Sequence, residues 1–207
     1  ALRKTKDRGL TNVEYAQADI MELGNLDRHF DLIDCSGVLH HLGDPMAGWR
    51  VLVDILKPGG IMKISLYSEA ARQDIVQGRS FITEKGYAAT IDDIRQCRQD
   101  IMTLAGAGNQ TMARICGVRD FFSLSNCRDL LFHAQEHRFT LPQIGEALPA
   151  LRLKLLGFEI RDQSALRNFK TAFPQQRALT SLSQWHKFEQ NNPDTFSGMY
   201  QFWCHKI

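Results

Sequence analysis

Two adjacent histidines, His40 and His41, follow closely on an apolar segment over residues 30–35 that predicts a β-strand. Imidazole titrates near pH 6.5, so a histidine at the mouth of a strand could take a proton from a reacting group. Small residues between the strand and the histidines would let the backbone approach a ligand closely. They are Cys35, Ser36 and Gly37. Ligands of open α/β sheets bind outside the carboxyl ends of strands, so this turn is a candidate binding edge.

A second candidate is Asp19, followed by Ile20, at the end of residues 12–19. This segment predicts a short strand with Val13 and Tyr15 on one face. A carboxylate at a strand end can accept hydrogen bonds from a ligand. The alternative is a turn aspartate that caps a helix.

The elements around these residues alternate between strand and helix. A helix is expected to end at Gly9, another to begin at Pro45 behind an Asp44 cap, and Lys57-Pro-Gly-Gly60 to stop it before a strand over 61–67. Such alternation predicts a parallel sheet with crossover helices. Residues 68–138 predict helices, one of them over 126–137. The end of the chain predicts a capping box at Thr140, strands over 157–161 and 199–204, and a helix over 183–190.

Four short motifs in this order resemble the second half of a class I S-adenosylmethionine (SAM)-dependent methyltransferase. They are Asp19-Ile20, Phe30-Asp-Leu-Ile-Asp34, Val38-Leu-His-His-Leu42 and Leu56-Lys-Pro-Gly-Gly60. The resemblance implies an α/β, partial Rossmann-like doubly wound sheet with an inserted helical lid. It divides the chain into a partial SAM-binding core (1–67), the helical insert (68–138) and C-terminal helices with a final strand pair (139–207).

The resemblance also implies roles for individual residues, with SAM as the cofactor. Asp19 would accept a hydrogen bond from the adenine amino group, and the Ile20 amide would meet a ring nitrogen. The turn formed by Cys35, Ser36 and Gly37 would face the methionine end of the cofactor. His40 and His41 would face the cleft, while Tyr67 and Arg72 would line the acceptor side. Catalysis would consist mainly of positioning, because the sulfonium methyl is already activated.

The methyl acceptor stays open between a small molecule, a glycan and a protein. Asp34-Cys-Ser-Gly37 stands where amino-group methyltransferases of the DNA type carry Asn-Pro-Pro-Tyr, which argues against that type. The phrases Asp120-Phe-Phe-Ser123 and Asn192-Pro-Asp-Thr-Phe196 resemble bacterial methyltransferases that often follow tetratricopeptide repeats. This implies an upstream partner-binding array.

The Gly-rich first turn of such domains does not precede Asp19, since only 18 residues are available. The chain also begins with Ala1 rather than Met. We therefore expect a fragment that lacks the first two strands, and a GxGxG turn roughly 30–50 residues upstream, one strand–helix–strand unit away. Alone, the chain is expected to aggregate and to lack measurable SAM binding.

Two other functions stay open from the sequence. His133-Ala-Gln-Glu-His137 matches the H-x-x-E-H pattern of inverted zinc peptidases, with His133 and His137 as ligands and Glu136 as base on one helix face. The chain could also be a non-catalytic module that binds a partner through an exposed apolar edge. The methyltransferase interpretation expects no bound metal.

Composition excludes several classes of protein. The chain is 43% hydrophobic and 23% charged with a net charge of +2, too balanced to indicate nucleic acid or an anionic membrane as a partner. It has no apolar run near the roughly 20 residues of a membrane span, and its polar, basic first residues lead us to expect no signal peptide. Five scattered cysteines indicate reduced thiols, and hence a cytoplasmic protein.

Overall fold

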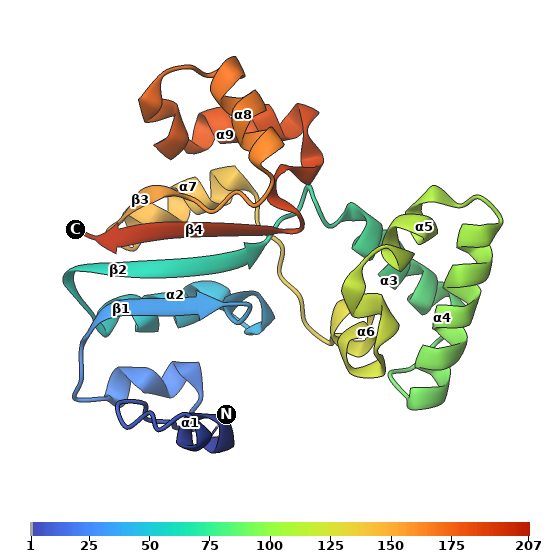
Figure 1. The fold of residues 1–207 in the computed structure, drawn as a ribbon, viewed down its shortest axis with the longest axis horizontal. Coiled ribbons are helices and arrows are strands. Elements are labelled where there is room, and N and C mark those ends of the chain that lie inside the picture. The colour runs from blue at the N-terminus through green and yellow to red at the C-terminus, as the bar shows by residue number, and fades with distance from the viewer. Residues whose placement is uncertain (1) are drawn as a thin grey trace.

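A computed structural model describes residues 2–207 and shows a mixed four-stranded sheet in the order β1-β2-β4-β3 (Figure 1). The strands are β1 (Phe30–Ser36), β2 (Leu56–Tyr67), β3 (Leu153–Phe158) and β4 (Met199–Lys206). β1 and β2 are parallel, whereas β4 is antiparallel to both β2 and β3. The predicted α/β class and Rossmann-like sheet are confirmed, but the sheet is mixed rather than parallel, because only β1 and β2 run in the same direction as neighbours.

Helices connect and cover the strands. The α-helices are α1 (Leu2–Asp7), α2 (Pro45–Asp54), α3 (Gln73–Lys85), α4 (Ile91–Gly106), α5 (Gln110–Cys116), α6 (Leu124–Leu131), α7 (Leu141–Ala150), α8 (Gln163–Ala172) and α9 (Leu182–Asn191). Short 3-10 helices are η1 (Ile20–Asn25), η2 (Leu39–His41), η3 (Arg119–Phe122), η4 (Gln176–Thr180) and η5 (Pro193–Phe196). The caps expected from the sequence are present: Asp44 accepts from the Met46 and Ala47 amides, and Thr140 forms a capping box.

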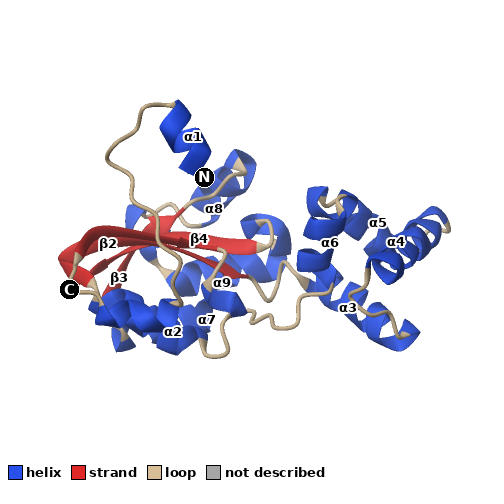
Figure 2. Cartoon of the chain, turned by 90° about the horizontal axis from the view of Figure 1, so that it is seen from below, coloured by secondary structure: helices blue, strands red, loops and turns tan. Residues whose placement is uncertain are grey.

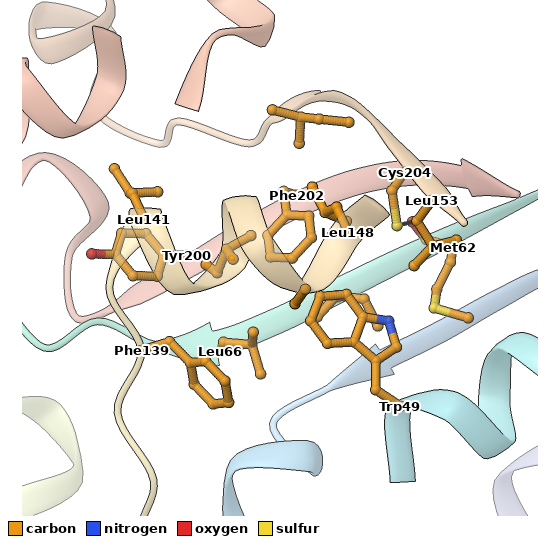
Figure 3. Close-up of a cluster of buried hydrophobic side chains, with 14 of the residues drawn as sticks. Trp49, Met62, Leu66, Phe139, Leu141, Leu148, Leu153, Tyr200, Phe202 and Cys204 are labelled. Carbon is orange, nitrogen blue, oxygen red and sulfur yellow. Dashed lines mark hydrogen bonds between the residues drawn. The ribbon is translucent and has the colours of Figure 1, made fainter. Parts of the chain in front are cut away.

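The main core lies between the sheet and helices α2 and α7, which share one face of it (Figure 2). Trp49 of α2 is fully buried beside Phe202 of β4, and Leu148 of α7 lies in the same cluster (Figure 3). The register pairs Leu32 of β1 with Ile61 of β2, and both side chains are exposed. The β1 end of the sheet is therefore covered on one face only within the described residues.

Helices α3 to α6 form a lobe beside the sheet with a hydrophobic core of its own (Figure 1). Ile94, Cys97 and Ile101 of α4 face inward there, at the helical spacing seen in the sequence. The chain leaves the sheet at Ser68 and returns at Phe139, and these two residues form an isolated parallel bridge. The two connections to the insert are thus held side by side.

The strand predicted over residues 12–19 is wrong. The segment is irregular, and its apolar residues Val13 and Tyr15 are exposed. A strand forms only when its amides and carbonyls pair with a neighbour. β1 pairs with β2 on one side, and no other described strand lies beside these residues.

Other boundaries also differ from expectation. Residues 57–60 were expected as a turn before the strand, but they lie within β2 as a bulge, since Leu56 pairs with Phe30 and Ile61 already with Leu32. Lys57 in the bulge binds Asp31 at 2.9 Å. β3 begins four residues before the predicted strand and bulges at Gly157. Helix α8 was not predicted, and α3 was expected only as part of the helical stretch over 68–138.

No helix among residues 2–207 has both the length and the apolar character needed to cross a membrane.

Candidate functional site

The turn after β1 is built as the sequence suggested. Gly37 has φ +77°, a conformation that favours glycine, and a Cβ placed there would meet no atom within 4 Å. Ser36 is exposed and donates to Asp34, while Ser65 of the neighbouring β2 donates to Ser36 at 3.2 Å. Cys35 is buried, and desolvation raises the pKa of its thiol to about 11. The turn therefore offers open space and hydroxyl groups, with no reactive thiolate.

Ile20, which follows Asp19, packs on α2 together with residues that follow β1. A Cβ on Gly48 of α2 would lie within 4 Å of side-chain atoms of Leu42, Leu39 and Ile20, so these residues meet over one helix turn. The Asp19 carboxylate caps η1 by accepting from the Met21 amide at 2.9 Å. The capping alternative is thus realised, and the exposed carboxylate still has a second oxygen free for a ligand.

His40 is fully buried, so it does not reach the cleft as a free base. Its ring stacks on Tyr67 with centroids 3.7 Å apart, and neither ring nitrogen has a hydrogen-bond partner. Burial lowers its pKa to about 3, and the nearby His41 adds to this, while the Ser65 backbone opposes it weakly. His40 is therefore neutral at physiological pH and serves as a packed ring.

His41 is the more accessible of the two histidines. Its Nδ1 lies 3.1 Å from the Gln135 carbonyl, which can only accept, so Nδ1 carries a proton and Nε2 keeps a lone pair. Burial lowers the pKa of His41, and the bond to Gln135 opposes the shift. His41 is hence the histidine able to accept a proton near neutral pH.

Tyr67 and Arg72 meet at the carboxyl end of β2. The Arg72 guanidinium lies 3.6 Å from the centroid of the Tyr67 ring, on which His40 also stacks. Both residues line a pocket of about 400 Å³ between the end of β2, the start of β4 and the helical insert. The remaining lining residues are Val118, Asp120, Asn126, Asp129, Leu130, Ser197, Gly198 and Met199.

The predicted zinc-binding helix face is wrong. Helix α6 ends at Leu131, so His133 and His137 do not share a helix face. The backbone carbonyls that would have continued the helix are used elsewhere: Arg79 donates to the His133 carbonyl and His41 to that of Gln135. No group of three or more His, Cys, Asp or Glu side chains within residues 2–207 is placed to hold a metal.

Glu136, the expected zinc-site base, instead forms ion pairs. Its side chain is 2% exposed, and Arg72 binds it through two parallel bonds of 3.1 and 2.8 Å. Arg79 and Arg138 lie 3.4 and 3.6 Å from the same carboxylate. Sequence reasoning missed this cluster, because its members are scattered along the chain and only the H-x-x-E-H pattern drew attention to Glu136.

Comparison with known proteins agrees with this fold. Residues 1–64 match the family described as "Methyltransferase domain". An uncharacterized protein of Synechococcus sp. is 29% identical over 184 residues, which is 85% of this chain and 43% of that protein. The ubiquinone/menaquinone biosynthesis C-methyltransferase UbiE of Shewanella oneidensis is 37% identical over 67 residues, 32% of this chain and 27% of the enzyme.

Among solved structures, PKMT2 of Rickettsia typhi in complex with AdoHcy superposes with a TM-score of 0.70 at 15% identity, covering 99% of this chain and 41% of that protein. The chain spans less than half the length of each of these relatives. Residues 1–64 thus match the methyltransferase domain family, and the chain as a whole shares the fold of the corresponding part of PKMT2.

Proposed function

We propose that the protein containing this chain transfers a methyl group from SAM to an acceptor bound beside Tyr67 and Arg72. The observation that carries this is the methyltransferase-domain match over residues 1–64, the part of the chain that contains the candidate cofactor residues. That the related PKMT2 was solved with AdoHcy, the product form of SAM, also supports this cofactor.

The residues at this edge fit one part of a SAM site. Open space lies beside Gly37, the adjacent Ser36 is exposed, and the Asp19 carboxylate is exposed as well. Asp19 would accept a hydrogen bond from the adenine amino group and the Ile20 amide would meet the ring, while Cys35, Ser36 and Gly37 would border the methionine portion. When bound, SAM supplies a methyl group on a positively charged sulfur that needs no further activation.

The chain's own residues would then bind the acceptor and manage its proton. His41 presents a neutral Nε2 that can accept a proton from an acceptor hydroxyl, amine or activated carbon. The His40 ring stacks on Tyr67, and the pocket bordered by Tyr67 and Arg72 would receive the acceptor. The buried stack keeps this wall of the site rigid, which favours in-line positioning.

Two measurements on the full-length protein test this function. Calorimetry with AdoHcy should show binding in the micromolar range. Tritiated SAM, incubated with an extract of source cells that lack the gene, should then label one fraction after separation into small molecules, glycans and proteins. Absence of both AdoHcy binding and labelling would contradict the proposal. The labelled fraction would identify the acceptor class, and an upstream repeat array stays a prediction.

A further inference from the structure

The side chain of Tyr67 is located by stacking rather than by a hydrogen bond within the described residues. The Arg72 guanidinium lies 3.6 Å from its ring centroid, and the His40 ring lies 3.7 Å from it with the planes inclined by 26°. His41 meets the same ring edge-on at 5.5 Å. The position of Tyr67 in the pocket wall therefore depends on what holds Arg72.

Arg72 is held by Glu136. The two parallel hydrogen bonds fix the plane of the guanidinium as well as its distance, because a bidentate pair allows little rotation. Both side chains are almost completely buried, at 8% and 2% exposure. A charge pair removed from water to this extent keeps its geometry far better than a surface pair.

The pair also joins the two connections between the sheet and the helical insert. Arg72 lies on the outgoing connection, just before α3, and Glu136 lies on the returning one, between α6 and α7. The same returning segment donates the His137 amide to the His40 carbonyl at 2.8 Å, and its Gln135 carbonyl accepts from His41. Glu136 thus lies in a segment that contacts both histidines.

We propose that Glu136 is a positioning residue of the methyl-transfer site, acting through Arg72 to hold the Tyr67 ring in the wall of the acceptor pocket. The expected effect on catalysis rests on the proposed function, whereas the positioning of the Tyr67 ring does not. Arg79 and Arg138 also lie near the Glu136 carboxylate but at longer distances, which leaves the two bonds from Arg72 as those that set the geometry.

The test uses full-length protein labelled with 3-fluorotyrosine, with the Tyr67 fluorine signal assigned by Tyr67→Phe. In Glu136→Gln, which keeps the shape but loses the charge, the Tyr67 signal should move towards that of free fluorotyrosine. The acceptor KM should rise at least threefold with AdoHcy affinity unchanged. Glu146→Gln, at an exposed site on α7, is the matched control and should leave both signal and KM unchanged.

A folded Glu136→Gln protein whose Tyr67 signal stays in place would overturn the proposal. If that variant does not fold, Arg72→Lys replaces it, since lysine keeps the positive charge but cannot bind in a planar, two-bonded way. Movement of the Tyr67 signal in Arg72→Lys supports the proposal, and an unmoved signal overturns it. If the wild-type protein does not bind AdoHcy, the proposed function is wrong. The fluorine signal would still test whether Glu136 positions Tyr67.

Discussion

The imidazole of His40 lies against the ring of Tyr67, with centroids 3.7 Å apart, while the Arg72 guanidinium covers the opposite face of the tyrosine. A protonated His40 would place a second cation 3.7 Å from this ring, at a fully buried position where neither ring nitrogen has a hydrogen-bond partner among the described residues. Its pKa is accordingly lowered to about 3, mainly by burial. The stack therefore requires the neutral form of His40.

Replacing His40 with phenylalanine should make the free energy of unfolding less dependent on pH in the acid range. The unfolded chain takes up this proton near pH 6.5 and the folded protein only near 3, so the stabilisation is complete above pH 6.5 and lost as pH falls towards 3. The slope from this group approaches about 1.4 kcal/mol per pH unit. At neutral pH His40→Phe should equal or exceed wild type by about 1 kcal/mol, because two unpaired buried nitrogens disappear.

Urea unfolding between pH 4 and 8 measures this difference, with His29→Gln at an exposed site as control. Equal pH dependence in His40→Phe and wild type would show that His40 ionises normally in the folded protein.

Local signals in the sequence were sufficient where the structure depends on near neighbours. Asp44 followed by Pro45 predicts the start of α2, and Thr140 with Gln143 predicts that of α7, because each cap closes within three residues. The sheet class followed from the alternation of strands and helices. The alternative that Asp19 caps a helix could also be predicted locally, because the amide that it binds lies only two residues away.

The sequence failed where distant partners decide the backbone. Residues 133–137 continue a helical pattern, yet Arg79 takes the His133 carbonyl from 54 residues away and His41 takes that of Gln135 from 94. Glu136 meets Arg72 across 64 residues, so nothing in its neighbourhood could signal that pairing. Which of the two histidines is fully buried was likewise decided by tertiary packing.

Asp19 offers a prediction that separates capping from ligand binding. In the full-length protein, Asp19→Asn keeps an oxygen for the Met21 amide but loses the charge, and it should weaken SAM binding by about 1–3 kcal/mol. Asp19→Ala should weaken it at least as much and also destabilise the fold by about 1 kcal/mol through the lost cap. Calorimetry and thermal melting measure the two effects. Unchanged SAM affinity in both variants would remove Asp19 from the cofactor site.

His41 should control the pH dependence of methyl transfer. Its pKa is lowered by burial, so its neutral form is present at and above pH 6.5, and kcat/KM should fall only as the pH drops below that value. His41→Ala should lower kcat by about 10²- to 10⁴-fold and abolish this acid limb. Rate profiles from pH 5 to 9 with the labelled acceptor measure it, and His29→Ala is the control. An intact acid limb in His41→Ala would assign the proton transfer to another group.

Glu189 is the buried carboxylate that joins α9 to the sheet. Tyr200 donates to both of its oxygens at 2.7 and 2.9 Å, and Ser68 donates at 3.1 Å from the point where the chain leaves β2 for the helical insert. Burial raises the pKa of Glu189, and the bonds from Tyr200 and Ser68 offset only part of the shift. The folded protein therefore holds this proton more tightly than the unfolded chain, whose glutamates titrate near pH 4.3.

The sign of the effect on stability follows from that difference. Above pH 4.3 the folded state binds more protons than the unfolded chain. The stabilisation that comes from Glu189 is therefore fully present below that pH and is lost as pH rises through the folded pKa. Glu189→Gln keeps an oxygen that accepts from Tyr200 and cannot ionise, so its stability relative to wild type should increase from pH 4 to 7.5. Urea unfolding across this range measures it, with Glu84→Gln, exposed on α3, as the control. A relative stability that falls with rising pH would mean that the hydrogen bonds from Tyr200 and Ser68 outweigh burial, and that Glu189 holds the end of β2 as a charged group.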